Sequence, residues 1–90
     1  MEHKLTSKFL MDVYAKIEKH GKATTTEWGE GYLLDGVQVC AGFDGYDLFF
    51  DNSRVQLTLG FHNTWHSNAD SEKLLDEFIQ QLEKIQKNYD

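Results

Sequence analysis

Two Asp-Gly pairs, Asp35-Gly36 and Asp44-Gly45, interrupt the alternating apolar residues in the middle of the chain. Asp-Gly between alternating apolar runs is the strongest short-range signal for a β-hairpin with a two-residue loop. Such a loop makes the residues on either side of it direct cross-strand partners. This feature therefore predicts a series of antiparallel strands joined by tight turns, and the loops define the register of those strands.

The predicted partners are apolar throughout. The first two loops pair Leu34 with Val37, Tyr32 with Val39, Phe43 with Tyr46, Ala41 with Leu48, and Val39 with Phe50. A third two-residue loop at Asn52-Ser53 pairs Phe50 with Val55, Leu48 with Leu57, and Tyr46 with Leu59. Because a one-residue slip would turn a strand's apolar set to the opposite face, this agreement predicts a sheet with one buried face. The strands are expected at about 25–34, 37–43, 46–51 and 54–61, the first of them an irregular edge strand.

Apolar residues recur at helical spacing on both sides of this stretch. The pattern predicts one helix at about 5–20 and another at about 70–88, with Asn68 or Asp70 as the N-cap of the second. Four strands offer a face nearly as wide as two packed helices. We therefore expect one α+β domain over residues 1–90, a two-layer α-β-β-β-β-α sandwich with an antiparallel four-strand meander and both helices on its apolar face.

Composition limits the class of protein. Of the 90 residues, 40% are hydrophobic and 27% are charged, which is typical of a globular domain. The single cysteine and the lack of a signal peptide or long apolar run predict a cytoplasmic protein that does not enter a membrane. The formal net charge of −6 argues against direct nucleic-acid binding, because the phosphate backbone is usually met by clustered Lys and Arg.

Phe49 is a large apolar residue on the face predicted to be polar, with Cys40 as its expected partner across the strands. It either shields backbone within its own sheet or contacts another chain. A chain this short has modest stability alone, and this together with Phe49 motivates the hypothesis of a homodimer formed through the outer face or an edge strand. The candidate interface consists of Phe49, Cys40, Leu33, Gln38, Gln56 and Thr58.

A second candidate site is the connection after the last strand, which contains His62, Trp65 and His66. Histidine is a common metal ligand, but no cysteine lies near this pair and no recognised spacing of carboxylates accompanies it. We therefore predict neither a metal nor another cofactor, and interpret the segment as a loop whose tryptophan packs over the sheet edge.

The chain contains no HExxH motif, Ser-His-Asp order or phosphate-binding glycine loop. The leading hypothesis is a non-catalytic protein-interaction module whose partner is another protein or a second copy. One alternative is an acidic inhibitor or immunity-type protein that occludes a nucleic-acid-binding enzyme. The other is a metal-assisted hydrolase that uses His62 and His66.

Overall fold

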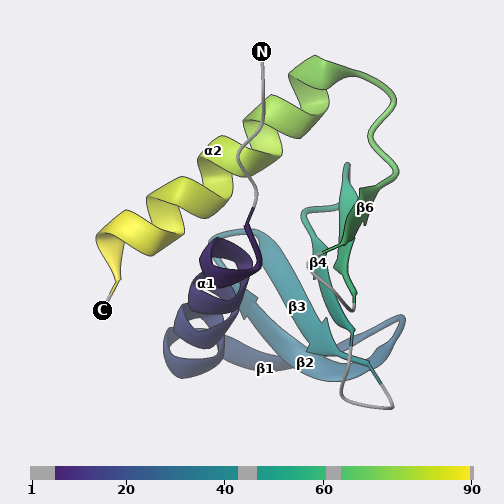
Figure 1. Cartoon of the computed structure of the whole chain (residues 1–90). Helices are drawn as coiled ribbons and strands as arrows, with labels where there is room; N and C mark the ends of the chain where they lie inside the picture. The colour runs from purple at the N-terminus through teal and green to yellow at the C-terminus, as the bar shows by residue number, and fades with distance from the viewer. Residues whose placement is uncertain (1–5, 43–46, 61–63, 90) are drawn as a thin grey trace.

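The computed structural model describes residues 6–42, 47–60 and 64–89. The described residues form two helices and six strands, in the order α1 (Ser7–His20), β1 (Lys22–Thr26), β2 (Gly29–Leu34), β3 (Val37–Ala41), β4 (Leu48–Asp51), β5 (Gln56–Leu59), β6 (Trp65–Ser67) and α2 (Glu72–Asn88) (Figure 1). The strands make one antiparallel sheet whose spatial order is β1 to β6, and the two helices pack against it. The α+β fold is thus as predicted. Within the described ranges, neither helix is long and apolar enough to cross a membrane.

Each helix begins at a side-chain cap and buries one stripe. The Thr6 hydroxyl accepts a hydrogen bond from the Phe9 amide at 3.1 Å. Ser71, rather than the predicted Asn68 or Asp70, caps α2 by accepting from the Leu74 amide at 3.2 Å. The core that these helices share with the sheet consists of Leu10, Val13, Ile17, Val37, Val39, Phe50, Val55, Leu57, Leu59, Phe78, Leu82 and Ile85.

The registers of the first two predicted hairpins are confirmed. Leu34 faces Val37 and Tyr32 faces Val39 across the Asp35-Gly36 loop, where both loop residues have positive φ. Across the next connection, Ala41 faces Leu48 and Val39 faces Phe50. The predicted pair of Phe43 and Tyr46 lies outside the described residues.

The third turn is longer than predicted, which shifts its register. The structure pairs Phe50 with Leu57 rather than with Val55. Asn52 causes the change, because its side-chain oxygen accepts from the amides of Arg54 at 3.0 Å and Val55 at 2.8 Å and so stabilises a wider turn. The register moves by two residues, so every apolar side chain stays on its predicted face.

The prediction of four strands is wrong, because the described residues contain two more. The region predicted as one irregular strand at 25–34 is the hairpin of β1 and β2, closed by the loop Glu27-Trp28. The Thr26 hydroxyl stabilises this loop by accepting from the Trp28 amide at 3.2 Å. The connection predicted after residue 61 contains β6, which pairs with β5 along its three residues.

One end of the sheet is tied to α2 by side chains. Gln81 donates to the Asp35 carbonyl at 2.9 Å and accepts from the Asn52 amide group at 3.0 Å, so it links two turns. The Tyr89 hydroxyl donates to the Asp35 carboxylate at 2.9 Å. These bonds orient the hairpins relative to the helix layer.

Candidate functional site

The outer face of the sheet is crossed by the chain's own β1–β2 hairpin (Figure 1). β2 pairs with β3 only from Tyr32 onward, and the strand departs from β3 at Gly31. A Cβ atom on Gly31 would lie 2.0 Å from the Val39 carbonyl oxygen, so no side chain fits at this close approach of two backbones. The bend at Gly31 therefore carries the tip of the hairpin over the face opposite the helices.

Three contacts hold the tip of this hairpin in place. Trp28 stacks on Phe49 with ring centroids 4.7 Å apart and an interplanar angle of 4°. Glu27 accepts a hydrogen bond from the Gln56 side chain on β5. The Cys40 thiol on β3 donates to the Glu30 carbonyl at 3.4 Å. The hairpin thus reaches across β3, β4 and β5.

The six residues of the predicted interface divide into two groups. Cys40 is 2% exposed beneath the hairpin, and Phe49 and Gln56 contact its tip directly. Gln38 and Thr58 are half-buried on the same face, while Leu33 is 39% exposed opposite Lys22 of β1. Trp28, which the sequence reasoning missed, is the apolar neighbour of Phe49. A tryptophan in a hairpin loop, where polar residues are usual, is the signal that could have identified it.

The two described residues of the histidine segment face opposite sides of the sheet. Trp65 pairs with Leu59 and packs against the core, whereas His66 pairs with Thr58 and is exposed. This follows from the pleat, in which neighbouring residues of a strand point to opposite faces. His62 lies outside the described residues. Within the described ranges, no three His, Cys, Asp or Glu side chains gather as a group that could hold a metal ion.

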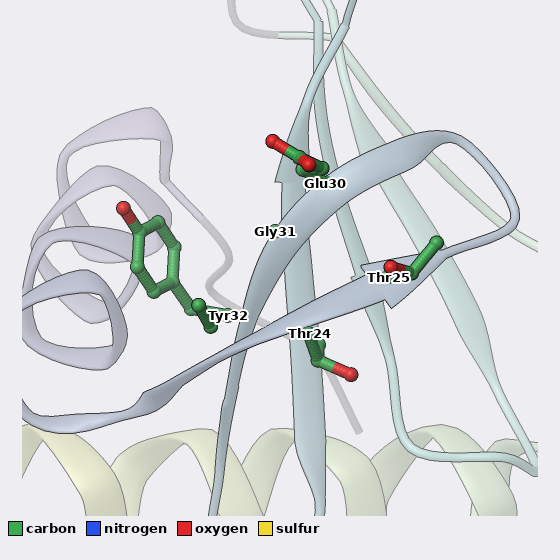
Figure 2. Close-up of a pocket in the computed structure, with 6 residues that line it drawn as sticks. Thr24, Thr25, Glu30, Gly31 and Tyr32 are labelled. Atoms are coloured by element: carbon green, nitrogen blue, oxygen red, sulfur yellow. The ribbon is translucent and has the colours of Figure 1, made fainter.

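A hollow of about 380 Å³ lies along the β1–β2 hairpin (Figure 2). Its lining includes Ala23, Thr25, Glu30 and Tyr32, and Figure 2 shows Tyr32 extending toward α1. The lining offers an aromatic ring, hydroxyl groups and one exposed carboxylate. It borders β1, which is an edge strand of the sheet.

Two of the described tyrosines have raised pKa values, and both occupy structural positions. Burial raises the pKa of Tyr14, whose ring meets Phe50 edge-on at 6.3 Å, and the Glu18 carboxylate raises it further. The hydrogen bond to Asp35 is the main cause of the raised pKa of Tyr89. Neither residue lines the hollow of Figure 2, so these shifts report on packing.

The fold and its surfaces define a small α+β domain with a meandering antiparallel sheet, one face under two helices and the other partly under a hairpin. A family model described as protein of unknown function (DUF3081) matches residues 5–90, and the chain belongs to this family. The comparisons with curated proteins and with solved structures found no match.

Proposed function

We propose that this chain is a non-catalytic, cytoplasmic protein-interaction module that forms a homodimer by pairing the β1 edges of two copies. The observation that carries the proposal is the free edge of β1, a regular five-residue strand that pairs with β2 on one side only within the described residues. Figure 1 shows β1 at the border of the molecule, on the side away from α2. An exposed edge of this kind is a template for a further strand.

The register shows which backbone groups are free on this edge. A two-residue loop is closed by a hydrogen-bonded pair, here Thr26 with Gly29. Hydrogen-bonded and non-bonded pairs alternate along an antiparallel ladder, so Ala23 and Thr25 turn their N–H and C=O groups away from β2. Both residues are exposed.

The free edge is complementary to itself. A two-fold axis at Thr24 overlaps all five residues of β1 with those of a second copy. Each Ala23 then faces Thr25 of the other chain, so the outward-facing backbone groups meet as hydrogen-bonded pairs. Lys22 faces Thr26, so no like charges lie directly opposite each other.

The edge is favoured over the outer face because Trp28 already stacks on Phe49. The apolar surface that suggested a dimer through Phe49 is therefore partly covered by the same chain. Metal-assisted hydrolysis depends on His62, which lies outside the described residues, together with His66, which is exposed on β6.

The test uses charge placed in the proposed seam. The double variant Ala23→Glu, Thr25→Glu sets carboxylates opposite each other across the two-fold axis and should yield monomers. The matched control Gln80→Glu, Asn88→Glu adds the same charge at exposed positions of α2 and should remain dimeric. Size-exclusion chromatography with light scattering at high micromolar concentration measures the mass, and circular dichroism verifies folding. A monomeric unmodified protein, or a dimer that the seam variant leaves intact, refutes the proposal.

A further inference from the structure

The opposite edge of the sheet borders a second hollow, of about 470 Å³, between β6 and the first turn of α2. Half-buried Trp65, Ala69 and Leu75 supply apolar surface to its lining. The exposed carboxylates of Asp70 and Glu72 also line it. An apolar surface beside charges of one sign is suited to an amphipathic ligand.

The backbone around this hollow is held by its own hydrogen bonds. Asn68 makes two hydrogen bonds with Gln56. Its backbone amide donates to the Gln56 carbonyl at 3.1 Å, and its side-chain oxygen accepts from the Gln56 backbone amide at 2.7 Å. The Ser67 hydroxyl accepts from the Ala69 amide at 3.0 Å, and Ser71 caps α2. The connection is therefore shaped before any ligand arrives, which lowers the entropic cost of binding.

Among the described residues β6 pairs with β5 alone, which leaves its other edge free beside the hollow. The bonds from Gly60 to the Thr64 carbonyl at 2.8 Å and from Asn68 to the Gln56 carbonyl mark alternate hydrogen-bonded positions. By that alternation His66 turns its backbone toward β5, while the backbone groups of Trp65 and Ser67 face outward. An extended segment that adds to β6 thus lies next to the hollow.

Charge indicates the chemistry of that segment. Among the described residues, no Lys or Arg lines the hollow, although the exposed His66 does, and no basic side chain forms a salt bridge with Asp70 or Glu72. The chain's net charge of −6 also attracts cationic partners. We propose that the β6 edge and this hollow bind an extended segment of a partner protein that carries both apolar and basic side chains at every second position, on the face that meets the hollow. Its apolar side chains pack on Trp65 and Leu75, and its basic side chains lie near the two carboxylates.

The probe is a short fluorescent peptide of Leu-Ser-Lys-Ser repeats, which places leucine and lysine on one face of a strand, titrated by anisotropy against the full chain. Asp70→Asn, Glu72→Gln should weaken binding about tenfold, since two charge contacts at the protein surface are lost. The matched control Glu18→Gln, Glu83→Gln removes the same charge from exposed helix positions and should bind normally. The same peptide with glutamate in place of lysine should not bind.

Three results would overturn the proposal: no binding of the lysine peptide, equal weakening by the control pair, or backbone amide NMR shifts that do not centre on Trp65 and Ser67. Equal weakening would mean attraction by net charge alone. The same titration on the monomeric seam variant separates this site from the proposed dimer, because the two edges belong to different strands, β1 and β6, at the two ends of the strand order.

Discussion

Replacement of Trp28 by alanine tests whether the β1–β2 hairpin is held over the outer face by its aromatic contact. The ring lies 4.7 Å from Phe49 in a nearly parallel stack, and the side chain is half-buried. Among the described residues, two hydrogen bonds also join the hairpin to the outer face. One runs from the Gln56 side chain to Glu27 at the tip, and the other from the Cys40 thiol to the Glu30 carbonyl near its base. The substitution should therefore loosen the tip and leave the helix-side core intact.

The expected loss of stability has two parts. A buried tryptophan removes about 150–250 Å² from water, so about half of that at 25 cal/mol/Å² gives roughly 2–3 kcal/mol as an upper estimate. The stack itself contributes about 0.5–1.5 kcal/mol beyond area. A double-mutant cycle with Phe49→Ala isolates this second part and should give a coupling of about 1 kcal/mol.

Urea unfolding, followed by circular dichroism, measures the free energy of unfolding of the unmodified protein, the two single variants and the double variant. Thiol modification supplies a local readout, because Cys40 is 2% exposed beneath the hairpin. Trp28→Ala should speed modification of Cys40 under conditions where the protein remains folded. A coupling near zero, with an unchanged thiol reaction rate, would refute the inferred hairpin contact.

Three further predictions concern the stability contributed by individual residues. Gly31→Ala should destabilise the protein by about 2–4 kcal/mol in urea unfolding, because the new Cβ meets the Val39 carbonyl oxygen at 2.0 Å. Gln81→Ala should cost about 1–2 kcal/mol by the same measurement, since two hydrogen bonds that link turns are lost. The bond to Asp35 raises the pKa of Tyr89 in the folded chain above its ordinary value of 10.0, so its contribution to stability is complete below pH 10 and is lost as pH rises through the folded pKa. The urea midpoint should fall above pH 10, and Tyr89→Phe should make that fall smaller.

The predictions for Gly31 and Gln81 each have a matched control. Gly60→Ala places its Cβ no closer than 3.4 Å to its neighbours and should change stability by under about 1 kcal/mol. Gln80→Ala alters an exposed glutamine on the same helix as Gln81 and should be nearly neutral. Equal effects of a variant and its control would contradict the assigned contact. For Tyr89, an alkaline transition that is identical in the phenylalanine variant would do the same.

The alternation of apolar residues along the strands predicted which side chains lie on the helix-side face of the sheet, because neighbouring strand residues must point to opposite faces. Even the error at Asn52 preserved that face, since the register moved by an even number of residues. The turn length itself depended on side-chain hydrogen bonds of one asparagine, which no hydrophobic pattern reports. The predicted helix boundaries lie close to the observed ones because buried apolar residues recur at helical spacing along both helices.

The outer face was harder to predict because it depends on a bend and a loop rather than on periodicity. Gly31 looked like an interruption of one strand, whereas it permits a close backbone approach that carries a hairpin across the sheet. The loop at Glu27-Trp28 lacks the usual turn residues, so its hairpin was merged into a single strand. β6 has three residues, too few for an alternating pattern to be distinguished from a polar connection.

Amide hydrogen exchange along β1 is the most direct test of the proposed edge-to-edge dimer. The N–H groups of Ala23 and Thr25 should exchange more slowly as protein concentration rises, because they become hydrogen-bonded across the seam. The amide of Thr24, which faces β2, should change little by comparison. If exchange at Ala23 and Thr25 stays fast at every concentration while amides along β2 and β3 are protected, the proposed dimer through β1 is contradicted.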